Sequence, residues 1–199
     1  MMQRALLCLA ALAGTGSAPA APVEYDIDPE HTYPSFEGDH LAGLSVWRGK
    51  FNRTTGSIVL DRAARTGTVD VVVDVSSVDF GHDEMNAQAR SDEFFDVEQY
   101  PEAAFSGTLA AFEDGAPTRL TGELTLHGVT RPVALDINSF KCMPHPVLER
   151  ESCGADAEGS FERDEFGLDV GKDMGFDMTV KLRIQVEAVA AESAVQGEK

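Results

Sequence analysis

Strict alternation of apolar and polar side chains over residues 119–138, RLTGELTLHGVTRPVALDIN, is the feature that most constrains the fold of this chain. Leu120, Leu124 and Leu126 fall on one face of a first strand, with Gly122 in the same row. A second apolar row follows a tight connection and contains Val133, Leu135 and Ile137. A period of two is typical of antiparallel strands with one face in water and the other against an apolar layer. The sequence therefore predicts a β-hairpin whose apolar face contacts either another protein layer or a bound apolar molecule.

Most of the remaining chain also has strand character. Alternating or β-branched segments cover residues 25–41, 46–61, 67–80, 102–114, 154–169 and 176–189. Pro34 cannot donate to a strand ladder, so its stretch is expected at an edge or a bend, and a turn is expected over residues 52–56. About eight antiparallel strands in one domain indicate an all-β sandwich or a closed barrel. Alternation alone does not separate the two, although an eight-stranded barrel can enclose one small ligand.

The segment over residues 81–101 lacks alternation and is rich in helix-forming residues. Asp83 is expected to cap a short helix that runs through Arg90, and Ser91 to cap a second turn before Pro101 ends the segment. This places a short helical insertion between the third and fourth strands.

The first 20 residues have the pattern of a secretory signal peptide. Arg4 precedes an apolar run that is too short to span a bilayer, and Ala18-Pro19-Ala20 fits the small-residue cleavage rule. The sequence therefore predicts export to the periplasm with residues 1–20 removed, a barrel domain over residues 21–190, and a flexible tail over residues 191–199.

The formal net charge of −18 bears on the partners of the chain. Such a charge favours solubility and argues against nucleic acid or anionic lipid surfaces as partners. No second apolar stretch is long enough for stable membrane insertion. An uncharged lipid held inside the fold is compatible with this charge.

Two cysteines remain once Cys8 leaves with the signal peptide. An exported protein with an even number of cysteines is expected to pair them, here Cys142 with Cys153, for a contribution of about 2–4 kcal/mol to stability. A zinc site would need more ligands than these cysteines and His145 supply, and a redox centre more typically contains C-x-x-C.

Four segments together resemble the YceI-like family of exported bacterial proteins: YDIDPEHTYPSFEGDHL, RSDEFFDVEQYPEAAFSG, GELTLHGVTRPVALDI and CGADAEGSFERDEFGLD. The resemblance implies a lipocalin-like antiparallel β-barrel with a helical insertion. It also implies non-covalent binding of a long isoprenoid or other amphiphilic chain in an apolar cavity, and a possible homodimer. His82 stands where the family often has an arginine before Asp83, and only part of the family has the cysteine pair.

A set of mostly apolar residues is predicted to line the cavity. It consists of Phe36, His40, Trp47, Phe51, Phe94, Phe95, Phe105, Leu124, Leu126, Leu135 and Ile137. Phe112 is a further candidate, and each phenylalanine has ordinary core packing as its alternative. Phe94 and Phe95 are expected to act as a lid, and Trp47 either lies at the opening or anchors the surface of its strand. His40 is a candidate for contact with a polar head group, but a structural role is favoured for it.

The leading hypothesis is an exported lipid-binding protein that holds an isoprenoid-like or other long-chain amphiphile for transport, storage or stress response. The alternatives are a solid-cored periplasmic interaction or stress module without lipid cargo, and a small enzyme that uses the cavity. The sequence contains no G-x-S-x-G or S-x-x-K motif and no compact set of metal ligands, so neither catalysis nor a cofactor is expected.

Overall fold

The computed structural model describes residues 21–192, so the predicted signal peptide and residues 193–199 of the predicted tail lie outside the described residues. More than half of the described chain is strand. The strands are β1 (Val23–Ile27), β2 (Ser35–His40), β3 (Ser45–Phe51), β4 (Thr54–Asp61), β5 (Thr66–Asp74), β6 (Val78–Asp79), β7 (Glu102–Glu113), β8 (Ala116–Leu126), β9 (Val129–Pro144), β10 (Glu151–Glu162) and β11 (Thr179–Ala190). Short 3₁₀ turns are η1 (Val75–Ser77), η2 (Arg163–Phe166) and η3 (Lys172–Met174), and α1 spans Asp83–Arg90. No helix within residues 21–192 has the length and apolar content needed to cross a bilayer.

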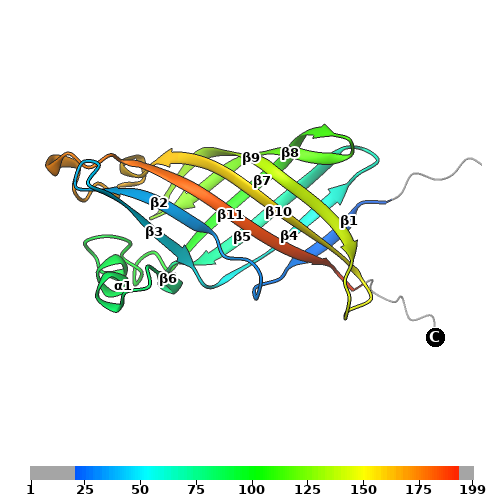
Figure 1. Ribbon diagram of the computed structural model, residues 1–199, viewed down its shortest axis with the longest axis horizontal. Helices are drawn as coiled ribbons and strands as arrows, with labels where there is room; N and C mark the ends of the chain where they lie inside the picture. The colour runs from blue at the N-terminus through cyan, green and yellow to red at the C-terminus, as the bar shows by residue number, and fades with distance from the viewer. Residues whose placement is uncertain (1–20, 193–199) are drawn as a thin grey trace, which may run out of the picture.

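Eight antiparallel strands close into a ring in the order β1-β4-β5-β7-β8-β9-β10-β11, and β11 pairs back onto β1. This confirms the predicted barrel. The remaining strands β2, β3 and β6 extend the wall at one end, where β2 pairs with β11, β3 with β2, and β6 with β3. In Figure 1 the barrel is long and narrow, with α1 beside β6 at this end and the β9–β10 hairpin projecting from the other.

The predicted turn over residues 52–56 is wrong in extent. Only Asn52 and Arg53 separate β3 from β4, and the ladder continues across the break through Asn52 N–H to Ser77 O (3.1 Å) and Asp74 N–H to Arg53 O (3.1 Å). Gly56 lies inside β4, where an added Cβ would stand 2.9 Å from the Cα of Val71 and closer still to a β5 carbonyl oxygen. The glycine therefore permits close approach of two strands and does not mark a turn.

The helix has the predicted bounds but different caps. His82, not Asp83, is the N-cap residue, and its Nδ1 accepts from the Met85 amide at 3.4 Å. Ser91 is the C-cap residue of α1, and the predicted second turn does begin there, because its carbonyl oxygen accepts from the Phe94 amide at 3.1 Å. Its hydroxyl does not cap that turn, since it donates to the Gln88 carbonyl oxygen at 2.7 Å. Arg90 holds the helix to the barrel, because its Nε donates to the Ser76 carbonyl oxygen at 2.7 Å.

A solid core fills the end of the barrel beside α1. Val75, Val78 and Phe166 are at most 1% exposed there, and Phe95 and Leu168 belong to the same cluster. Packing of α1 and η2 against this cluster closes part of the end of the barrel. A cavity borders this core and continues along the barrel between two further buried clusters.

Candidate functional site

A cavity of about 630 Å³ runs along the barrel interior. The inward rows of the strands form its wall, including the two apolar rows of the β8–β9 hairpin. The apolar face of residues 119–138 therefore borders an internal space. The alternating pattern had left open whether this face contacts another protein layer or a space that can hold an apolar molecule. The volume is within the range of about 300–1,000 Å³ that is usual for small-molecule sites.

All eleven residues of the set predicted to bind the ligand line this cavity. They are Phe36, His40, Trp47, Phe51, Phe94, Phe95, Phe105, Leu124, Leu126, Leu135 and Ile137. Their contact with a ligand stays a prediction. Phe112 is not part of the wall: it packs against Tyr25, Leu60 and Ala188, which themselves line the cavity.

The cavity opens at the end formed by the β2–β3 hairpin and η3. Lining residues at this end are accessible from outside: Trp47 is 38% exposed, Val170 43% and Met174 64%. At the opposite end Tyr25 and Ala188 also line the cavity, and each is 1% exposed. A long ligand would therefore enter past η3 and reach toward the β9–β10 hairpin.

Aromatic rings surround the opening. The rings of His40 and Trp47 stack with centroids 4.1 Å apart, and Phe176 meets His40 edge-on at 5.7 Å. Phe94 and Phe95 follow α1 and meet in a T-shaped pair at 4.9 Å. The His40, Trp47 and Phe176 rings give the opening a mostly apolar lining, whereas Phe95 is 7% exposed and belongs to the core cluster beside α1.

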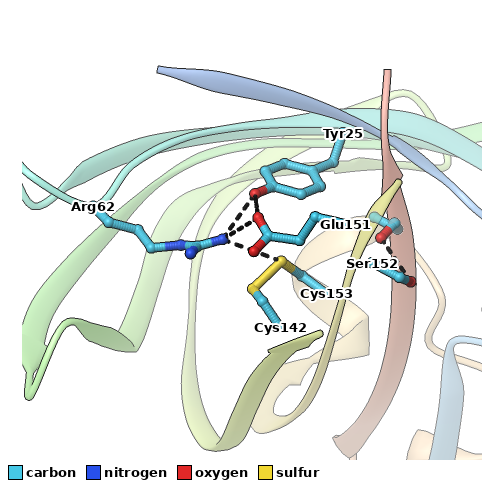
Figure 2. Close-up of a disulfide and its surroundings, with 7 residues drawn as sticks. Tyr25, Arg62, Cys142, Glu151, Ser152 and Cys153 are labelled. Atoms are coloured by element: carbon cyan, nitrogen blue, oxygen red, sulfur yellow. Dashed lines mark hydrogen bonds and ion pairs between the residues drawn. A yellow bond between two sulfur atoms is a disulfide. The ribbon is translucent and has the colours of Figure 1, made fainter. Parts of the chain in front are cut away.

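A disulfide and a small polar cluster occupy the closed end (Figure 2). Cys142 and Cys153 are directly paired across β9 and β10 and form the predicted disulfide. Arg62 forms an ion pair with Glu151, donates to Tyr25 Oη at 2.9 Å and lies 3.8 Å from Cys153 Sγ. Tyr25 donates to Glu151 Oε1 at 2.5 Å. Glu151 and the two sulfurs lie within 4.8 Å of one another, but the sulfurs are bonded to each other and are not free to ligate a metal.

Comparison with known sequences decides the family. The YceI-like domain matches residues 25–188. The chain belongs to the YceI family. A UPF0312 protein of Pectobacterium carotovorum is 35% identical over 194 residues, which cover 95% of this chain and 98% of the relative. Protein YceI of Salmonella arizonae is 33% identical over 177 residues, which cover 88% of this chain and 90% of the relative.

Solved structures share the barrel of this YceI-family chain. Burkholderia cenocepacia BcnA matches with a TM-score of 0.63 at 21% identity, over 81% of this chain and 98% of BcnA. A polyisoprenoid-binding domain from Saccharophagus degradans matches with a TM-score of 0.61 at 18% identity, over 85% of this chain and 99% of that domain. At such identities the likeness shows the fold.

Sequence patterns missed the polar residues of the YceI-family cavity. Asp39, His82, Glu84, Gln88 and Arg163 all contribute to its wall. Three of them belong to α1 or its N-cap and Arg163 begins η2, so none of these four lies in an alternating strand row. The segment FERDEFG carries the family resemblance, but nothing in its spacing indicates that its arginine lines a cavity.

The ion pair at the closed end predicts a pH-dependent contribution to stability. Partial burial acts to raise the pKa of Glu151, but hydrogen bonds from Tyr25 and Arg62 and the charge of Arg62 outweigh it and hold the pKa below its ordinary value of 4.5. Because the pKa of Glu151 is lower in the folded than in the unfolded protein, the ion pair stabilises the fold above pH 4.5. This stabilisation is lost as the pH falls through the pKa that Glu151 has in the folded protein. We expect less than about 1 kcal/mol, since both side chains are more than a third exposed.

Urea unfolding of Glu151→Gln and of the unchanged protein at a series of pH values measures this contribution. The stability difference between them should be largest near neutral pH and shrink in strong acid. Glu123→Gln, on the exposed face of β8, is the control and should show no such trend. A constant difference for Glu151→Gln at all pH values would contradict the prediction.

Proposed function

We propose that this protein is an exported lipid-binding protein that holds a long-chain, isoprenoid-like amphiphile in its barrel. The observation that carries the proposal is the apolar cavity of about 630 Å³, open at one end and closed at the other. A flexible hydrocarbon chain that enters such a cavity gains about 25 cal/mol for each Å² of apolar surface removed from water. The gain can exceed the cost of ordering the chain.

The comparisons support the same proposal. The Saccharophagus degradans domain with the same barrel is named for polyisoprenoid binding. Residues 1–20 have the pattern of a signal peptide, which fits a carrier or storage protein of the periplasm. The cavity within residues 21–192 supports this proposal over the alternative of a solid-cored module.

Native mass spectrometry of the protein, purified from the periplasm of the bacterium that produces it naturally, tests the proposal. We expect a mass excess that disappears on denaturation, and organic extraction should yield a long-chain amphiphile. Val71→Phe should lower the affinity for the extracted lipid about tenfold, because Val71 lines the cavity and a larger ring takes up space that the tail needs.

Val72→Phe is the matched control. Val72 is the next residue of β5 but points to the outside, where it is 36% exposed, so the same substitution should leave lipid binding unchanged. Thermal unfolding of both variants verifies that they fold. The proposal would be refuted if the protein without substitutions carried no lipid after purification and bound none when incubated with lipid extracts.

A further inference from the structure

Arg163 is a buried cation in the wall of the cavity. It is the first residue of η2, is 8% exposed and lines the cavity. Its Nη1 donates to the Leu168 carbonyl oxygen at 2.5 Å and its Nη2 to the Val170 carbonyl oxygen at 2.6 Å. The guanidinium carbon lies 5.9 Å from the centre of the Phe94 ring. The side chain therefore connects the η2–η3 loop with the turn that follows α1.

No acidic side chain within residues 21–192 forms an ion pair with this cation. The ion pairs among residues 21–192 do not include Arg163. The adjacent Asp164 pairs with Lys172 at 2.6 Å, and an oxygen of Asp39 accepts the Asp177 amide at 2.9 Å. The carboxylates of Asp164, Asp169 and Asp39 lie close enough to favour the charged form of Arg163, but none of them forms a hydrogen bond or ion pair with its guanidinium.

Burial of an unpaired charge is energetically unfavourable. Desolvation lowers the pKa of Arg163, although a guanidinium still keeps its proton at any physiological pH. A guanidinium also has more N–H donors than two carbonyl oxygens engage. An anion in the cavity would supply a countercharge in direct contact, which none of these carboxylates provides, together with further acceptors. The planar donor group suits the oxygens of a carboxylate or phosphate.

We propose that Arg163 binds the anionic head group, a carboxylate or phosphate, of the amphiphile whose tail fills the cavity. This inference rests on the proposed function and adds the chemical class of the head group. Arg163 lies in η2, and η2 leads into the loop at the open end of the cavity, so the head group would remain near the opening while the tail extends toward the disulfide.

Binding of matched probes tests the head-group assignment. Farnesol, farnesoic acid and farnesyl phosphate share one tail and differ in the head group, and isothermal titration calorimetry measures each affinity. The unchanged protein should bind at least one of the two anions about tenfold or more tightly than the alcohol, because charge-assisted hydrogen bonds are the strong ones. The ratio between the two anions identifies the preferred head group, and inorganic phosphate alone should not compete.

Arg163→Gln should remove this preference while it leaves the affinity for farnesol within about twofold, and Arg163→Lys should keep part of it. A parallel loss of affinity for all three probes in Arg163→Gln would indicate that Arg163 only holds its loop, and would overturn the inference. An unchanged preference in Arg163→Gln, or none in the unchanged protein, would also overturn it. Failure of all three probes to bind the unchanged protein would instead count against the proposed function.

Discussion

Gly122→Ala is expected to lower the free energy of unfolding by about 3 kcal/mol, the upper end of the range for overpacking substitutions. Gly122 in β8 pairs directly with Gly107 in β7. A Cβ at position 122 would stand 2.6 Å from the Cα of Gly107 and closer still to the Ser106 carbonyl oxygen. Backbone atoms cannot move aside as a flexible side chain can. The two strands would have to separate at the middle of the barrel wall, which urea unfolding would detect.

Gly38→Ala is the matched control for this substitution. Gly38 also lies in a strand, and an added Cβ would meet nothing within 4 Å. Its expected effect is within about 0.5 kcal/mol in either direction. Equal stability of the two alanine variants would show that the β7–β8 wall is looser than the structure indicates.

The glycine pair illustrates what the sequence predicts and what it leaves open. Period-two alternation over residues 119–138 was sufficient to predict the hairpin and its apolar face. It could not indicate why Gly122 interrupts a row of leucines, because the reason lies in β7. There the ring of Phe105 lies over both glycines, 2.7 Å from the position of an added Cβ at Gly107. A contact between separate strands leaves no periodic signal in either one.

The breaks in the strands were also not predictable from local pattern. Residues 25–41 were expected to form one strand-like stretch, yet β1 ends at Ile27 and β2 begins only at Ser35. Both strands pair with β11, at different places along it. The interruption at Pro34 agrees with the expected bend. That β1 and β2 lie one after the other along the same edge of β11 follows from the length of β11, which the local sequence pattern of residues 25–41 does not contain.

The candidate site shows the same limit. Alternation and aromatic content identified the apolar wall, because inward-facing positions of a strand recur every second residue. Arg163 and the polar residues of α1 contribute to the wall from helical turns. Their inward orientation depends on how those turns pack across the end of the barrel. The sequence alone therefore does not distinguish a charged residue that lines the cavity from one that faces solvent.

Phe166→Ala is expected to cost about 3–5 kcal/mol of stability, the range for truncation of a buried aromatic residue. Phe166 is fully buried in the solid core beside α1, meets Phe161 in a T-shaped contact at 5.1 Å and does not line the cavity. Its removal leaves a void among well-packed neighbours. Urea unfolding should show the loss, whereas the affinity of the folded protein for an alkyl probe should stay close to its original value.

Phe105→Ala should behave in the opposite way, because Phe105 is only partly buried and one side of its ring borders the cavity. A ring that already faces empty space has fewer contacts to lose, so we expect a smaller cost of about 1–2 kcal/mol and a change in probe affinity. The pair of variants therefore tests whether the centre of the barrel is hollow in solution. If side chains filled it from end to end, the two truncations would cost equal stability and neither would alter binding.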